Sequence, residues 1–199
     1  PYIKEAYELG LIEKNPYDAI HIKCGKSEGI KYLTIPERDA VEALKLKGTD
    51  ALVRDLFSFS CYTGLAFADV IKVSKEDVKQ AGNSYYIEDF RQKCGSKYRI
   101  TLLPKAIQIL AKYDFNLHRI STQKANMHLK IIAGLAGIQK NLPFHSGRHT
   151  FATWALKMGI PIELVSKMLA HADITTTQIY AKVLAEDVDK GFEMLRTRC

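Results

Sequence analysis

Long hydrophobic runs and paired cysteines are both missing from this sequence. No apolar run approaches the roughly 20 residues that a membrane-spanning helix needs. The first fifteen residues carry charges throughout, so they do not read as a signal peptide. The four cysteines lie far apart and form no C-x-x-C pair, which argues against a zinc site or a disulfide framework: Cys24, Cys61, Cys94 and Cys199. This cysteine usage fits a reducing compartment, and we expect a cytoplasmic protein.

Internal repeats and low-complexity segments are also absent from the 199 residues. Hydrophobic residues make up 47% of the chain and charged residues 26%, a balance typical of a globular protein with a real core. Lysine and arginine number 29 against 22 acidic residues, which gives a net charge of +7. Because each neutralised phosphate releases condensed counterions, this excess favours a nucleic-acid partner. A basic helical domain without any nucleic-acid role is the alternative, and its DNA binding would be absent or insensitive to salt.

The chain divides into two unequal parts around a polar linker. Pro1 stands where a complete chain has methionine, so we expect a piece of a longer protein. Residues 1–14 have the pattern of the end of a helix, which Asn15-Pro16 would stop. The linker is polar and contains glycine. We therefore assign residues 1–21 to the end of one domain, residues 22–33 to the linker and residues 34–199 to a second domain.

Helix signals begin directly after the linker. Thr34-Ile-Pro-Glu37 has the capping-box pattern and predicts a helix from there to about Lys47. Thr49 is expected to cap the next helix, which ends at Gly64 because glycine suits a left-handed cap. Two further elements are predicted in this stretch, a short helix over 65–73 and a turn that starts at Ser74.

The residue pattern changes between Ser84 and Leu103. This stretch is rich in tyrosine, isoleucine and phenylalanine, and Gly95-Ser96 is a turn signal, so a small antiparallel sheet is predicted. Helices are predicted again in five places: after Pro104, after Ser121, over 145–158, over 161–170 and from Thr175 onward. The expected fold class is therefore mainly α with a small antiparallel β insert (α+β).

The segment that starts at His145 has the residues of an anion site. His145 and Arg148 are three apart, so both would project from one face at the start of a helix. The backbone N–H groups and the dipole at a helix N-terminus favour an anion, and an arginine fork beside them can hold a phosphate. The alternative is an ordinary amphipathic helix with two polar surface residues.

A second chemical candidate lies near the C-terminus. His171 is expected at a helix end, and Tyr180 follows nine residues later. A tyrosine hydroxyl can attack phosphorus when the phosphate is charge-neutralised and a proton acceptor is near. The chain has ten tyrosines, so a structural role for any one of them is the alternative, as is a capping or core role for His171.

Together the two segments resemble the catalytic domain of the tyrosine recombinases, or phage-type integrases. The run H-x-x-R-H-T-F-A, followed by L-x-H-x-D-x-x-T-T-x-x-Y, carries this resemblance, which extends over roughly residues 30–195. It implies that Tyr180 is the nucleophile that joins to a DNA 3′-phosphate and that Arg148 binds the scissile phosphate. It also implies that His145 and His171 bind this phosphate and aid proton transfer. Arg91-Gln-Lys93-Cys-Gly resembles the family's R-x-K-T-G stretch, which implies that Lys93 is the general acid for the departing 5′-oxygen. Residues 1–21 would then be a remnant of the core-binding (SAM-like) domain.

One position departs from the family pattern. The family's first catalytic arginine follows Thr-Gly-Leu, and this sequence has Ala66 there. The domain is then either a degenerate DNA binder or an enzyme in which another cation substitutes. Arg91 is the candidate, because residues i and i+2 of a strand share a face and Arg91 would point the same way as Lys93. A backbone phosphate contact or a surface salt bridge is the alternative for Arg91, and a solvated hairpin lysine is the alternative for Lys93.

The resemblance also implies the reaction and the partners. We expect site-specific breakage and rejoining of double-stranded DNA for integration or excision of a mobile element, with no metal, nucleotide or other cofactor. The alternatives are a non-catalytic DNA-binding regulator, which Ala66 supports, and DNA relaxation of the type IB topoisomerase kind. The resemblance also implies a homotetramer on DNA and a four-way DNA junction. The helix predicted after Val183 would pack either on the core of its own chain or on a neighbouring subunit. Further DNA contacts are expected from Lys75, Lys97 and Arg99.

Overall fold

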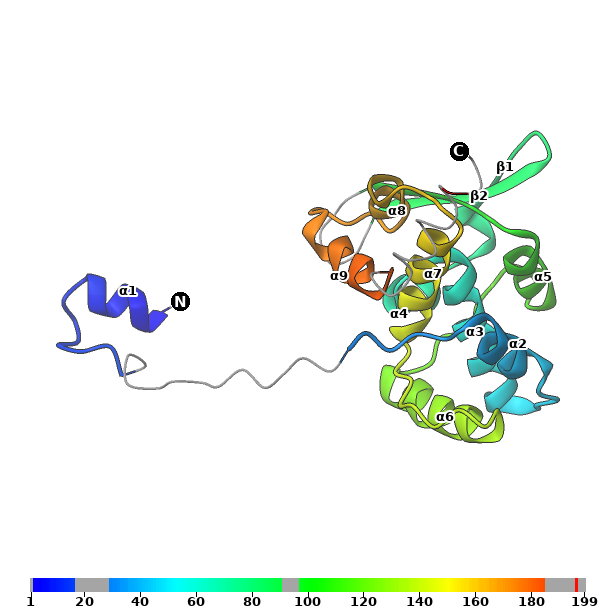
Figure 1. Ribbon diagram of the computed structural model, residues 1–199, viewed down its shortest axis with the longest axis horizontal. Helices are drawn as coiled ribbons and strands as arrows, with labels where there is room; N and C mark the ends of the chain where they lie inside the picture. The colour runs from blue at the N-terminus through cyan, green and yellow to red at the C-terminus, as the bar shows by residue number, and fades with distance from the viewer. Residues whose placement is uncertain (1, 17–28, 91–96, 185–195, 197–199) are drawn as a thin grey trace.

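The computed structural model describes residues 2–16, 29–90, 97–184 and 196. These residues are mainly helical with one three-stranded antiparallel sheet, which confirms the predicted fold class (Figure 1). In chain order the elements are α1 (Tyr2–Glu8), α2 (Ile35–Ala43), α3 (Gly48–Thr63), α4 (Phe67–Val70), the 3-10 turn η1 (Lys75–Asp77), β1 (Val78–Ala81), β2 (Ser84–Phe90), β3 (Lys97–Thr101), α5 (Pro104–Lys112), α6 (Thr122–Leu135), α7 (Ser146–Lys157), α8 (Ile162–Met168) and α9 (Thr175–Leu184). Among them no helix is long and apolar enough to cross a membrane.

Helix α3 is the centre of the helical body. It packs against α2, α5, α6 and α7, and every residue from Asp55 to Thr63 is buried. A helix that is buried on nearly all sides has no polar face to give to solvent, so its polar side chains need partners inside the fold. The hydroxyls of Ser60 and Thr63 donate to the carbonyl oxygens of Leu65 and Phe59. Gly64 ends it in the left-handed conformation, with φ of +69°. A Cβ at this position would lie 2.7 Å from the Phe151 ring, so the predicted glycine cap is also required by the close packing of α7.

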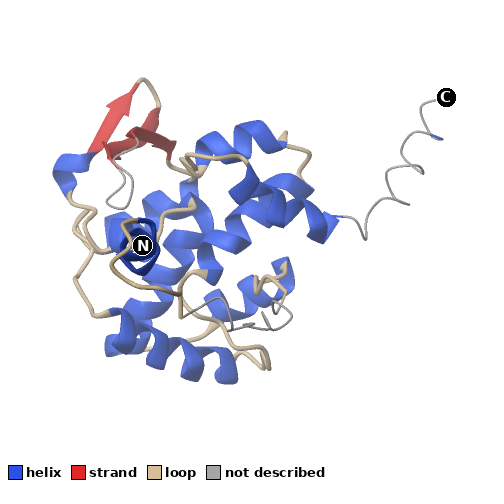
Figure 2. Ribbon diagram, turned by 90° about the vertical axis from the view of Figure 1, so that its left-hand side faces the viewer, coloured by secondary structure: helices blue, strands red, loops and turns tan. Residues whose placement is uncertain are grey.

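The sheet lies at one edge of the helices, with strand order β1-β2-β3 (Figure 2). Ile87 of β2 pairs with Ile100 of β3, and both side chains are buried on the face toward the helices. The antiparallel sheet predicted over 84–103 is thus confirmed for its described strands. The prediction missed β1, a polar edge strand of which only Val78 is not fully exposed. Its sequence lacks the alternation of apolar and polar residues that marks a half-buried strand.

Several helix boundaries differ from their predictions. The Thr34–Glu37 capping box is present, but α2 ends at Ala43 and not at Lys47, because Leu44 leaves the helix in an extended conformation and packs against the core. Thr49 does not cap α3, because the helix already begins at Gly48 and its N-cap, Lys47, makes no side-chain capping bond. The helix predicted over 65–73 is only the single turn of α4. The one predicted over 1–14 ends at Glu8, before Gly10 turns the chain with φ of +70°.

Candidate functional site

Three elements bring four of the predicted site residues to one region. His145 is the N-cap of α7 and Arg148 lies in its first turn, His171 follows α8, and Tyr180 lies in α9, which packs on both α7 and α8. Gly147 lets this end of α7 approach α3 closely, since a Cβ there would lie 2.8 Å from Ser60 Oγ. The first turn of α7 is therefore fixed against the centre of the fold.

The remaining predicted site residues are placed differently. Arg91 and Lys93 lie outside the described residues. Lys97 begins β3, Arg99 is exposed on the same strand, and Lys75 is exposed at the start of η1. The Arg99 guanidinium stacks on the Tyr86 ring, 4.0 Å from its centroid.

Arg148 is a buried cation, with only 4% of its surface exposed. Its guanidinium donates to the carbonyl oxygens of Gly64 at 2.7 Å and Leu169 at 2.6 Å, the residues that end α3 and α8. This burial excludes the alternative of a polar surface residue for Arg148. A fixed guanidinium at a helix N-terminus is a site that stabilises negative charge without reorganising.

Tyr180 is buried more completely than Arg148, at 1% exposure. Burial raises the pKa of its phenol above the ordinary value, and the positive charge of Arg148 opposes that rise. Its hydroxyl lies 2.8 Å from Nδ1 of His149. The predicted nucleophile is therefore a neutral phenol in contact with a possible proton acceptor.

His149 lies among the predicted site residues, although the sequence analysis did not single it out. Its ring lies between those of His145, at a centroid distance of 4.5 Å, and Tyr180, at 5.5 Å. Burial, together with the charges of His145 and Arg148, lowers the pKa of His149 to about 4. The signal was present in the sequence, since His149 directly follows Arg148, but nothing in the chain alone placed it against Tyr180.

His171 is held in place by the start of α9. Its Nδ1 lies 2.7 Å from the hydroxyl of Thr177, which is fully buried, and its backbone N–H donates to Ser166. The preceding residue, Ala170, has φ of +48°, so α8 ends in a left-handed conformation without a glycine. The ring orientation of His171 is thus set by the threonine-rich start of the following helix.

Ala66 lies in the turn that contacts Arg148. It is the N-cap of α4, two residues after the Gly64 carbonyl that accepts from the Arg148 guanidinium. The position at which the family pattern has its first arginine therefore lies two residues from a partner of Arg148. Alanine supplies no charge there.

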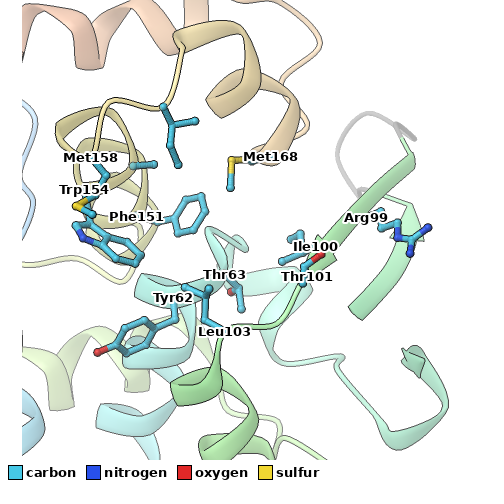
Figure 3. A pocket seen from close by; sticks show the side chains of 12 residues that line it. Tyr62, Thr63, Arg99, Ile100, Thr101, Leu103, Phe151, Trp154, Met158 and Met168 are labelled. Carbon is cyan, nitrogen blue, oxygen red and sulfur yellow. The ribbon is translucent and has the colours of Figure 1, made fainter. Parts of the chain in front are cut away.

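One apolar pocket of the described residues is separate from this cluster. It has a volume of about 380 Å³ and lies between α3, β3, α7 and α8. Phe151, Trp154 and Met168 face it from one side and Thr63 and Leu103 from the other, as Figure 3 shows. None of the four clustered site residues lines it, and an apolar wall does not hold phosphate. This pocket is therefore distinct from the cluster of Arg148, His149 and Tyr180.

Curated relatives of this chain are tyrosine recombinases. The XerD recombinase of Staphylococcus epidermidis is 31% identical over 156 residues, which cover 68% of this chain and 52% of that protein. The XerD recombinase of Oceanobacillus iheyensis is 51% identical over 57 residues, 27% of this chain and 19% of that protein. The chain spans about half the length of its relatives, or less.

Solved structures share the fold at low sequence identity. The Tn1549 transposon integrase, in complex with a circular-intermediate DNA, superposes with a TM-score of 0.70 at 17% identity, over 89% of this chain and 70% of that one. The XerA recombinase gives a TM-score of 0.67 at 22% identity, over 85% and 66%. The family model described as the phage integrase family matches residues 38–187. The chain thus belongs to the phage integrase family, as the resemblance to tyrosine recombinases implied.

Proposed function

We propose that this chain carries the catalytic centre of a site-specific DNA recombinase, with Tyr180 as the nucleophile. The observation that carries the proposal is the packing of the Tyr180 hydroxyl into one buried cluster with a histidine base and the Arg148 cation. The phenol oxygen attacks the scissile phosphorus, the bond from phosphorus to the 5′-oxygen breaks, and a 3′-phosphotyrosyl bond forms. That ester conserves the energy of the original bond, so a partner strand can reverse the step without ATP.

Arg148, His145 and His171 supply the charge stabilisation in this proposal. A pentavalent phosphorane carries one more negative charge than the phosphodiester, and preorganised donors in a site that excludes water stabilise it most. Arg148 is already oriented by two backbone carbonyls, and His171 by Thr177. Removing one such donor typically costs about a hundredfold to a thousandfold in rate.

Two roles rest on the family resemblance alone. Lys93 would protonate the departing 5′-oxygen, and Arg91 would replace the arginine that Ala66 lacks. The test is cleavage by Arg91→Ala beside Lys72→Ala, an exposed control. Equal activity in the two variants would remove Arg91 from the mechanism.

The proposed substrate is double-stranded DNA carrying recombination sites, for integration or excision of a mobile element. The net charge of +7 supports a polyanionic partner. The exposed Lys75 and Arg99 would contact the phosphate backbone of the DNA, as would Lys97. Solved neighbours with this fold include recombinases in complex with DNA. Assembly as a homotetramer around a four-way junction is part of the same proposal.

A covalent adduct tests the function directly. Duplexes recovered from a random-sequence pool by their binding to this chain would be prepared with a nick, so that cleavage releases a short strand and traps the intermediate. We expect a protein–DNA adduct on a denaturing gel for the natural chain and for Tyr113→Phe, and none for Tyr180→Phe. Salt-sensitive binding without an adduct in the natural chain would contradict the proposal and favour a non-catalytic regulator, for which Ala66 is the structural reason.

A further inference from the structure

The hydroxyl of Tyr180 has one hydrogen-bond partner among the described residues, Nδ1 of His149 at 2.8 Å. His149 belongs to α7 and Tyr180 to α9, so this contact joins the helix that carries Arg148 to the helix that carries the nucleophile. The bond is inside the protein, since Tyr180 is 1% exposed and His149 is half-buried. Water therefore has little opportunity to replace the imidazole as the partner of the phenol.

The direction of this hydrogen bond follows from the protonation states. Burial raises the pKa of Tyr180, so the phenol keeps its proton near pH 7 and has an O–H to donate. Burial and the neighbouring charges lower the pKa of His149 to about 4, so the imidazole is neutral near pH 7 and one of its two nitrogens accepts. Nδ1 is the nitrogen that faces the phenol. Nδ1 is therefore unprotonated, and the ring proton is on Nε2.

The groups that depress the basicity of His149 are the same groups proposed to hold the scissile phosphate. Burial is the largest cause of the lowered pKa of His149, and the charges of His145 and Arg148 follow. Arg148 lies on α7 and His145 is its N-cap, while Tyr180 faces the ring from α9. When a phosphate anion binds beside Arg148, its negative charge offsets the positive charge that the guanidinium exerts at the imidazole. Protonated His149 then becomes easier to form at the moment when the phenol must lose its proton.

We propose that His149 is the general base that takes the proton of the Tyr180 hydroxyl during strand cleavage, which makes it a further catalytic residue of this site. As the phenol oxygen bonds to phosphorus, its O–H bond breaks and the proton moves to Nδ1. The 5′-oxygen departs with the electrons of its bond to phosphorus and takes a proton from the general acid of the proposed function. In the rejoining step the 5′-hydroxyl attacks phosphorus and returns its proton to that acid, the bond between phosphorus and the phenol oxygen breaks, and Nδ1 returns the proton to the phenol oxygen. This inference rests on the proposed function, since it assigns the proton acceptor for the same nucleophile.

The tautomer can be measured without any DNA. In the natural chain labelled with ¹⁵N-histidine, we expect the His149 Nδ1 to show the shift of an unprotonated, hydrogen-bonded nitrogen at pH 7. That shift should move in Tyr180→Phe and not in Tyr113→Phe. A protonated Nδ1 at pH 7 would overturn the proposal, because His149 would then donate to Tyr180 and could not accept its proton.

The catalytic role is tested by His149→Asn, because the asparagine side chain can keep a polar group near Nδ1 but is not a base. In single-turnover assays with the nicked duplex we expect adduct formation at pH 7 to slow by about a hundredfold to ten-thousandfold, as for loss of a general base. The rate should then rise about tenfold per pH unit as the phenol ionises unaided. His118→Asn, at an exposed histidine, is the matched control with an unchanged rate.

A duplex with sulfur in place of the bridging 5′-oxygen separates the two proton transfers, since its leaving group needs no proton. We expect it to leave the defect of His149→Asn in place. Three results for His149→Asn would each overturn the proposal. They are a rate within threefold of the natural chain at pH 7, a defect that does not change with pH, and a full rescue by the sulfur duplex. Should His149→Asn fail to fold in a thermal melt, the tautomer measurement decides. Absence of any adduct in the natural chain would instead refute the proposed function, with the tautomer still readable.

Discussion

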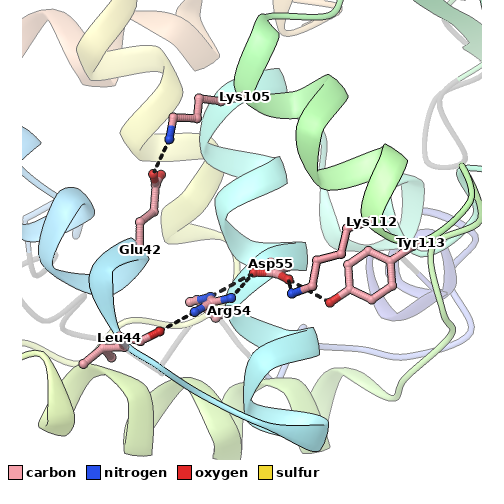
Figure 4. Close-up of polar contacts among 7 residues, drawn as sticks. All are labelled: Glu42, Leu44, Arg54, Asp55, Lys105, Lys112 and Tyr113. Carbon is pink, nitrogen blue, oxygen red and sulfur yellow. Dashed lines mark hydrogen bonds and ion pairs between the residues drawn. The ribbon is translucent and has the colours of Figure 1, made fainter.

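Two tyrosine hydroxyls of this chain make hydrogen bonds of equal length to partners of opposite character. Tyr180 lies 2.8 Å from the neutral imidazole of His149, and Tyr113 donates to the Asp55 carboxylate, also at 2.8 Å. Figure 4 shows the second cluster, in which Arg54 and Lys112 also bind Asp55. The first cluster holds its phenol against a group that can gain a proton, and the second holds it against a carboxylate already paired with two cations.

The pKa shifts of the two tyrosines have different causes. Burial alone would raise the pKa of Asp55, but hydrogen bonds from Lys112, Tyr113 and Arg54 hold it below the ordinary value. The carboxylate is thus a poor proton acceptor, and both burial and its negative charge raise the pKa of Tyr113. At Tyr180 the nearby charge is the Arg148 cation, which works against the rise caused by burial. A buried phenol becomes a candidate nucleophile through the charge and basicity of its neighbours.

The largest expected difference between the clusters is in adduct formation by matched variants. Tyr180→Phe should abolish the covalent adduct and Tyr113→Phe should leave it unchanged, while each costs about 1 kcal/mol of unfolding free energy for one lost hydrogen bond. Adduct gels and urea titrations measure the two effects. An adduct that survives in Tyr180→Phe, or disappears in Tyr113→Phe, would break the comparison.

The next largest difference is expected when the arginine of each cluster is replaced by alanine. Arg148→Ala is expected to slow adduct formation by about a hundredfold to a thousandfold. It should also cost about 3 kcal/mol of stability, because two buried carbonyl oxygens lose their donor. Arg54→Ala removes the donor of the Leu44 carbonyl and a partner of Asp55, so we expect a loss of stability of about 2 kcal/mol and no change in rate. Equal rates in the two variants would contradict the assignment of Arg148.

The two clusters should also lose stability in different pH ranges. His149 has a folded pKa of about 4 against an ordinary 6.5, so between these values the unfolded chain binds more protons and stability falls as pH falls. Allowing for partial solvent access, we expect roughly 1 to 2 kcal/mol over this range, absent in His149→Asn. Asp55 also has a lowered pKa, but for a different reason, because hydrogen bonds in the folded chain stabilise its charged form. The stability that it contributes is lost as pH falls below its ordinary pKa of 3.8.

Urea titrations between pH 7 and pH 3 of the natural chain, His149→Asn and Asp55→Asn separate these ranges. The unfolding free energies of the natural chain and His149→Asn should change differently with pH above pH 4. Those of the natural chain and Asp55→Asn should change differently with pH below pH 4. A His149→Asn chain with the same slope as the natural one between pH 6.5 and pH 4 would show that His149 is not held neutral.

The smallest expected effect comes from the backbone beside His171. Ala170 has φ of +48°, a conformation that costs an L-residue about 1 kcal/mol and glycine almost nothing. Ala170→Gly should therefore stabilise the chain by about 0.5 kcal/mol after the loss of the methyl contact. The control is Ala136→Gly, at the end of α6 with φ of −82°, which should destabilise by a similar amount. A destabilised Ala170→Gly chain would show that no strain is stored next to the site.

Much of the fold could be predicted because its signals are local. The capping box at Thr34, the left-handed cap at Gly64 and the cap of α6 at Ser121 each depend on a few neighbouring residues. The misses are of another kind. Whether Leu44 continues α2 or leaves it is decided by packing against the core, and β1 exists because β2 offers it a partner.

In the candidate site too, some features follow from local sequence patterns and others depend on tertiary packing. A specific sequence pattern pointed to Arg148, His145, His171 and Tyr180, and the structure places all four in one region. The pairing of His149 with Tyr180 could not be predicted, because it depends on how α9 packs on α7, 31 positions along the chain. Burial of the Arg148 guanidinium under two helix ends is likewise a property of tertiary packing.

The most direct test of the central claim is the chemical location of the DNA in the covalent adduct. The adduct formed by the natural chain would be digested with nuclease and trypsin and analysed by mass spectrometry. We predict a residual nucleotide on the peptide spanning residues 168–182, attached to Tyr180. A nucleotide on the peptide spanning residues 113–119, or on any residue other than Tyr180, would contradict the account.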